Sequence, residues 1–118
     1  METLLKMRPR PTAVFVTVDV LAIGAIRAIV DARLRVPQDI SVVGFDDIPP
    51  AAFHCPTLTT VSMPKWELGQ RAAEVLIARI QNANPGRAIT RVVLPTSLII
   101  RESTGVLRNG SRSPERVE

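Results

Sequence analysis

The sequence contains no tyrosine and only 3% aromatic residues, so aliphatic side chains must form the core of this 118-residue chain. Its basic residues are not interleaved with aromatic ones, which argues against a stacking platform for single-stranded nucleic acid. The single cysteine, Cys55, excludes an internal disulfide framework and suits a reducing compartment. No apolar run has the length of a membrane span, and the first residues lack the apolar core of a signal peptide. We therefore expect a soluble, cytoplasmic protein that has no membrane partner.

The motifs that usually indicate an enzyme are also missing. The sequence has neither a glycine-rich phosphate loop nor a cluster of residues with metal-ligand spacing. His54 and Cys55 are adjacent, but sequence neighbours in a loop usually point apart, and no third group is evident that would orient a nucleophile. The net charge of +4 comes largely from scattered arginines, which we interpret as solvated surface charge. We expect no cofactor, no metal and no catalytic activity.

The first half of the chain reads as strand, helix, strand. Residues 13–18 and 40–45 are β-branched apolar runs, which are typical of strands covered on both faces of a sheet. Between them, residues 20–34 carry apolar side chains at helical spacing. Asp19 precedes this helix as a candidate N-cap, and Gly24 within it suggests a close packing contact. This order predicts a right-handed βαβ unit of a parallel sheet within a single domain.

The second half predicts a loop, a strand, a helix and a final extended segment. The loop covers residues 46–57, the strand covers 58–61, and the helix opens near Pro64. Trp66 is expected to be partly buried on this helix. The extended segment over 90–103 is bent at its proline, and residues 106–118 form a polar, frayed tail. The apolar stripe of the helix consists of Leu68, Ala72, Val75, Leu76 and Ile80.

The stretch "SVVGFDDIPP" places two adjacent carboxylates directly after a strand that reads as buried. In open parallel sheets ligands bind outside the carboxyl ends of the strands, so Asp46 and Asp19 should flank one crevice. Asp47 is better explained as a structural carboxylate of the loop. Three interpretations remain for the pair: a solvated turn, a Mg²⁺ site, and a pocket that reads hydroxyl groups. A phosphoacceptor domain would need an acidic pair on an earlier strand and a lysine after a later one, and that order is missing.

Five segments, in this order and spacing, resemble the LacI-type family of bacterial transcription repressors. The resemblance covers about residues 10 to 104. It implies an α/β fold that is the parallel-sheet, Rossmann-like half of a type I periplasmic-binding-protein-like core, in three αβα layers. Residues 1–105 would form most of the C-terminal subdomain of that core. The segments are "RPTAVFVTVDVLAIGAIRAI", "LRVPQDISVVGFDDIPPA", "PTLTTV", "ELGQRAAEVLIARI" and "VVLPTSLIIREST".

The resemblance also assigns residues to an effector site. Asp46 matches the aspartate with which the family binds its effector, and an ionised carboxylate can accept two hydroxyl donors. Val18 stands where relatives often carry an asparagine, so a polar contact is lost there. Asp19 is a neighbour of this pocket, and its wall continues at Met63, Lys65 and Leu68. These departures suggest a wall less polar than that of a typical sugar repressor.

The implied function is to sense a sugar or related metabolite and to form a homodimer. Ile23, Arg27 and His54 fall at or near positions similar to the family's interface residues. In a complete repressor the effector would shift the orientation of two subdomains, and DNA would bind only through a headpiece that this sequence lacks. The alternative is the solute-binding component of a sugar transporter, which shares the core but is exported and monomeric.

Overall fold

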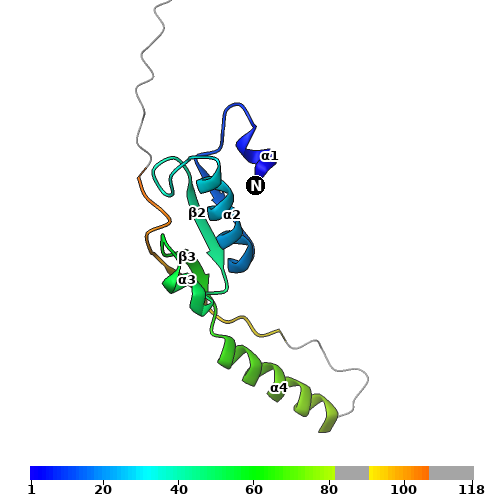
Figure 1. The fold of residues 1–118 in the computed structure, drawn as a ribbon. Coiled ribbons are helices and arrows are strands. Elements are labelled where there is room, and N and C mark those ends of the chain that lie inside the picture. Colours follow the sequence, from blue (N-terminus) through cyan, green and yellow to red (C-terminus); the bar gives the residue numbers. More distant parts are fainter. Residues whose placement is uncertain (82–90, 107–118) are drawn as a thin grey trace, which may run out of the picture.

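The computed structural model describes residues 1–81 and 91–106, and these form a mixed α/β fold. The sheet has the order β1-β2-β3-β4, in which β1, β2 and β3 are parallel and β4 runs antiparallel to β3 (Figure 1). The predicted α/β class and parallel sheet are therefore confirmed. The polar tail expected from residue 106 lies, beyond its first residue, outside the described residues. The strands are Ala13–Phe15, Ser41–Phe45, Thr59–Ser62 and Ser97–Ile99.

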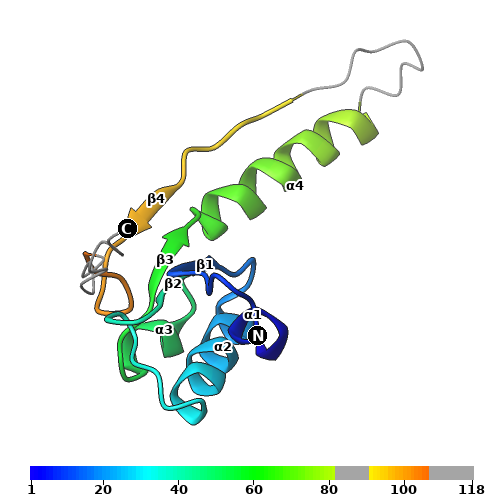
Figure 2. The ribbon, with the colours of Figure 1, turned by 90° about the horizontal axis from the view of Figure 1, so that it is seen from above.

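Three of the four helices in the described residues lie on one face of the sheet (Figure 2). Their apolar side chains meet those of the sheet in one core, in which each fully buried isoleucine contributes about 1.5–3 kcal/mol. Gly24 of α2 does not mark a close contact as predicted, since a Cβ there would meet nothing within 4 Å. The helices are α1 Glu2–Leu5, α2 Asp19–Asp31, α3 Pro49–Phe53 and α4 Lys65–Gln81. The core residues are Ala22, Ile26, Ile29, Ile40, Val42, Ala51 and Leu58.

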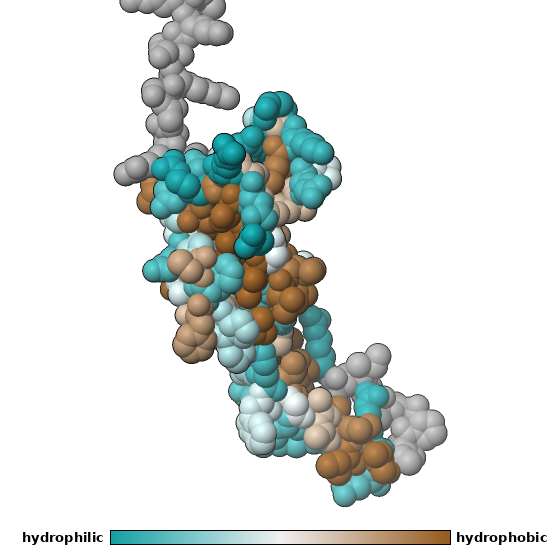
Figure 3. Space-filling model, viewed as in Figure 1, coloured by the Kyte–Doolittle hydropathy of each residue, from teal (hydrophilic) through white to brown (hydrophobic). Residues whose placement is uncertain are grey.

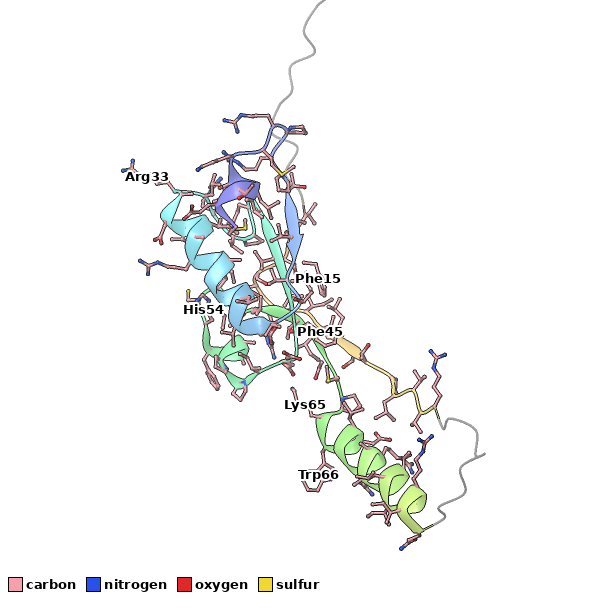
Figure 4. The ribbon with its side chains drawn as sticks, turned by 90° about the vertical axis from the view of Figure 1, so that its right-hand side faces the viewer. Phe15, Arg33, Phe45, His54, Lys65 and Trp66 are labelled. Atoms are coloured by element: carbon pink, nitrogen blue, oxygen red, sulfur yellow. The ribbon has the colours of Figure 1, made fainter. Side chains whose placement is uncertain are left out.

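The opposite face of the sheet is open in the described part of the chain. Phe15 is 59% exposed, and Phe45 on the neighbouring strand is half-buried on the same side (Figure 4). The prediction that the first two strands are covered on both faces is therefore wrong. The exposure of residues alternates along β1 and β2 instead: in β2, Val42 and Gly44 are buried, whereas the other three residues are only half-buried. Of the three layers expected, two are present in the described residues.

Helix α4 begins at the predicted place but does not pack on the sheet. It projects from the end of the molecule beyond β3, and it contains no buried residue (Figure 1). Trp66 is 87% exposed, so the prediction that it is partly buried is wrong. Hydrophobic surface is visible at the far end of the helix (Figure 3). The pattern predicted the helix correctly because the stripe is periodic, but no described residue packs closely enough on the stripe to bury it.

The segment after β2 is more regular than predicted. The expected irregular loop contains α3, whose first residue, Pro49, occupies a first-turn position where a missing N–H costs nothing. Ala51 of this helix is fully buried in the core, and its N–H donates to the carbonyl of Ile48 at 2.9 Å. The short helix thus anchors the turn at residues 46–48 to the body of the protein.

Candidate functional site

The turn that follows the carboxyl end of β2 has an unusual backbone. Asp46 has φ +112° and Asp47 has φ +51°, so two consecutive non-glycine residues lie in the left-handed region. Such conformations are strained and persist only where the surrounding structure enforces them, and they cluster at functional sites. β2 lies between β1 and β3, and all three strands are parallel. The turn is therefore flanked on both sides by the carboxyl ends of neighbouring strands.

Hydrogen bonds from β3 and α4 enforce this backbone. The N–H of Asp46 continues the strand pairing to the carbonyl of Val61 at 3.0 Å, and the N–H of Asp47 donates to Thr60 Oγ1 at 3.3 Å. The carbonyls of both aspartates accept from Nζ of Lys65, the first residue of α4. The turn is therefore held by α4 and β3 in addition to its own strand.

Asp19 provides the third support. Its side chain is fully buried; Oδ1 accepts from Thr60 Oγ1 at 2.7 Å, and Oδ2 accepts from the N–H of Ile48 at 3.0 Å. The prediction that Asp19 caps α2 is wrong, because Val18 is the N-cap, and no side chain provides a capping hydrogen bond. Asp19 is instead the first residue of the helix, and its carboxylate joins α2 to β3 and to the turn.

Asp47 forms an ion pair that sequence analysis missed. Its Oδ1 lies 2.8 Å from Nη2 of Arg101, and both side chains are largely buried, at 25% and 18% exposure. The hydrogen bond from Arg101 is the main reason that the pKa of Asp47 lies below its usual value, so Asp47 is ionised at neutral pH. Arg101 lies 54 residues further along the chain, so no local pattern could reveal the pair.

The carboxylate of Asp46 differs from its neighbours. In the described part of the chain it has no hydrogen-bond or ion-pair partner, although the backbone around it is fully bonded. The side chain is half-buried, so it is reachable from solvent. A held carboxylate with unused acceptor capacity can bind two donors from a ligand, and such charge-assisted hydrogen bonds are short and directional.

The charges beside the turn decide between a metal and a hydroxyl ligand. The ammonium of Lys65 occupies the carbonyl oxygens of Asp46 and Asp47, and the guanidinium of Arg101 occupies the carboxylate of Asp47. Apart from the free carboxylate of Asp46, these oxygens of the turn are therefore already bonded to cations, and both cations would repel a divalent ion. A neutral ligand that donates hydroxyl protons to Asp46 meets neither obstacle.

The other predicted effector residues are distributed unevenly around this turn. Lys65 contacts it directly, whereas Val18 is exposed at the start of α2. Met63 is half-buried and lines a hollow of about 370 Å³ between the chain that enters α4 and the chain that returns to β4. Leu68 lines a different groove along α4. The described residues thus bring Asp46 and Lys65 together, but they do not close a pocket around Asp46.

The predicted interface residues lie on the surface next to the core. Ile23 of α2 is half-buried, and Arg27 one turn later is exposed and paired with Asp31 at 2.9 Å. His54 follows α3, and its Nδ1 lies 3.3 Å from the carbonyl of Pro56. The neighbouring Cys55 is exposed. No helix among the described residues is long and apolar enough to span a membrane.

Comparisons with known proteins place these features in a family. Residues 1–104 match the model of the periplasmic binding protein-like domain. The ribose operon repressor of Haemophilus influenzae is 44% identical over 102 residues, which are 86% of this chain and 30% of that protein. The chain therefore spans about a third of the length of the curated relatives that it matches.

Solved structures agree with this placement. A LacI family transcriptional regulator from Enterococcus faecium with bound ribose is 37% identical, with a TM-score of 0.71 over 82% of this chain and 35% of that one. The lac repressor dimer bound to operator and an anti-inducer is 35% identical, with a TM-score of 0.72 over 87% of this chain and 36% of that one.

Proposed function

The chain belongs to the periplasmic binding protein-like domain family, its relatives are LacI-type regulators, and we propose that it is the effector-sensing and dimerising part of such a repressor. In this proposal residues 1–105 belong to the C-terminal subdomain of the sensing core, and residues 106–118 are a tail. The protein acts in the cytoplasm without catalysis, and DNA is contacted by a headpiece outside this chain. The solute-binding alternative has less support, because the relatives are repressors.

The observation that carries the proposal is the free carboxylate of Asp46 on a fully bonded turn. The protein holds a strained backbone to keep this one group available, and the nearby cations favour a neutral ligand that donates hydroxyl protons. A sugar is such a ligand, and a relative that is 37% identical was solved with ribose. Val18, Asp19, Met63, Lys65 and Leu68 belong to the proposed wall or its support.

The exposed surfaces around the site are an argument for a second subdomain that packs against them. The carboxylate is half-buried in the described residues, the apolar stripe of α4 is exposed, and the second face of the sheet is uncovered. A second subdomain that covers these surfaces would also close over Asp46. Effector bound between the two parts would then favour one relative orientation and change operator affinity through the headpiece.

Ribose binding by a chimera tests the role of Asp46. Residues 1–104 replace the matching segment of the Enterococcus faecium regulator, which supplies the other half of the cleft. We expect the chimera to bind ribose in calorimetry and Asp46→Asn to weaken binding at least about tenfold, because an amide accepts fewer hydroxyl protons than a carboxylate.

Asp39→Asn is the matched control for this chimera. Asp39 is paired with Arg35 at 3.2 Å after α2, away from the turn, so its loss should leave ribose affinity unchanged. Equal affinity of the Asp46→Asn chimera and the unmodified chimera would reject the proposed site. A folded chimera without ribose binding would reject ribose as a model of the effector.

The outer face of α2 is the surface through which we propose that the chain dimerises. Val20, Ile23, Gly24 and Arg27 share this face at helical spacing, and Val20 is 63% exposed. The open space above Gly24 leaves room for a side chain from a partner. A two-fold axis through this face would place each copy's α2 against the other's. His54 and the exposed Phe53, at the end of α3, extend the same proposed interface.

A charge on this face should separate the copies. We expect Val20→Glu to weaken dimerisation of the chain at least about tenfold in sedimentation equilibrium, because it buries an unpaired carboxylate at the interface. Leu76→Glu on α4 is the control, since Leu76 is exposed to a similar degree, at 59%. Equal dissociation constants for the two variants, or a monomeric unmodified chain, would contradict this interface.

A further inference from the structure

The turn at Asp46 and Asp47 contacts both chain segments that join the sheet to α4. The outgoing segment leaves β3 after Ser62 and enters α4 at Lys65, which lies at the junction between the sheet and the helix (Figure 4). The returning segment passes through β4 and reaches Arg101 two residues after the strand ends. Both segments therefore pass the turn, and each carries one cation that binds it.

Arg101 uses two of its donors on two different elements. Nη2 donates to Oδ1 of Asp47 at 2.8 Å, and Nη1 donates to the carbonyl of Leu58, next to β3, also at 2.8 Å. The planar guanidinium fixes the angle between these two donors, so it holds the returning segment in one position against both. Among the ion pairs of the described residues, the others join residues three or four apart and are more exposed.

Lys65 holds the outgoing segment by a different set of contacts. Its ammonium donates to the backbone carbonyls of Asp46 and Asp47, so its position depends on the strained backbone of the turn rather than on a side chain. A rotation of Asp46 that moved its carbonyl would release the first residue of α4. A movement of α4 would equally remove a bond that keeps Asp46 in its left-handed conformation.

We propose that Lys65, Asp47 and Arg101 form a latch that couples the backbone of Asp46 to the direction of α4. The three are positioning residues: none needs to touch the effector, and each acts through the turn. The inference rests on the proposed function only where it assigns Asp46 to the effector. Helix α4 and the chain beside it carry exposed apolar surface. The latch would therefore transmit a change at Asp46 to that surface. By reciprocity, fixing α4 would favour effector binding.

The ligand-free chain tests the latch by itself. Spin labels at the exposed Cys55 and at Ala73→Cys on α4 report the distance between the body and the helix, with labelled chain diluted into unlabelled Cys55→Ser chain. We expect the distribution of distances between the labels to show a single narrow peak, and we expect this peak to be lost in Arg101→Met and in Asp47→Asn. Arg35→Met removes an exposed local pair beyond the end of α2 and should keep the narrow peak. If Arg101→Met does not fold, Asp47→Asn still tests the latch, because this variant leaves no carboxylate without a partner.

Ribose binding by the chimera distinguishes the latch from the proposed function. Arg101→Met should lower ribose affinity about five- to tenfold. Arg101→Lys, which keeps the charge but cannot span both acceptors, should lie between Arg101→Met and the unmodified chimera. An unchanged peak and unchanged affinity in Arg101→Met and Asp47→Asn would overturn the latch, even if Asp46→Asn abolished binding. Unchanged affinity in Asp46→Asn together with a lost peak in Arg101→Met would leave the latch standing and overturn the effector role of Asp46.

Discussion

Replacing Asp19 with alanine is expected to lower the free energy of unfolding by about 4 kcal/mol, because a buried hydroxyl and a partly buried N–H lose their acceptor at once. The hydroxyl of Thr60 and the N–H of Ile48 both bond to this carboxylate, and the side chain has no exposed surface. Since a domain of this size is stable by about 5–15 kcal/mol, the loss is a large part of the total. Urea denaturation followed by circular dichroism measures it.

Two further variants make this prediction specific. Asp19→Asn keeps the shape and one acceptor oxygen, so we expect a loss of only about 1–2 kcal/mol. Asp31→Ala removes a carboxylate from the other end of the same helix, where the side chain is 57% exposed and paired with Arg27, and should cost less than about 1 kcal/mol. Equal losses for Asp19→Ala and Asp31→Ala would show that the buried bonds of Asp19 do not stabilise the fold.

Gly44→Ala is expected to destabilise the protein by about 2–4 kcal/mol, because the added methyl group has no space. A Cβ at Gly44 would overlap Oδ1 of Asp19 and would lie 3.0 Å from Cδ2 of Leu58. The carboxylate would have to move and would lose its bond to Thr60. The backbone of Gly44 has no positive φ, so the effect comes from crowding and not from conformation.

Gly24→Ala is the matched substitution with the opposite sign. A Cβ at Gly24 meets no atom within 4 Å, and alanine favours the helix over glycine by about 1 kcal/mol. We expect this variant to gain stability by up to that amount when it is measured at concentrations that keep the chain monomeric. A loss of similar size in both variants would mean that the close approach of β2 to Asp19 is not the cause.

These two glycines show what the sequence could predict and what it could not. The helix over α2 was predictable because its apolar residues recur at helical spacing, and Gly24 was the reasonable candidate for a close contact. The close contact occurs at Gly44 instead, because β2 lies directly against the first residue of α2. Only the crossover between strand and helix determines that distance, and no local pattern reports it.

The candidate site was predictable to a similar extent. Apolar runs that end in a polar residue indicate where a parallel sheet presents its strand ends, so Asp46 could be found from its position. Arg101 could not, because it reaches Asp47 only after the chain has passed through α4 and returned. The two prolines after Asp47 indicated a loop, yet Pro49 fits the first turn of α3, where it lacks only an N–H that a helix does not use.

The uncovered face of the sheet has an energetic consequence. Phe15 and Leu98 are each more than half exposed and lie on this face. A surface that packed against this face would remove both side chains from water, and the apolar area buried there would add to the stability of the sheet.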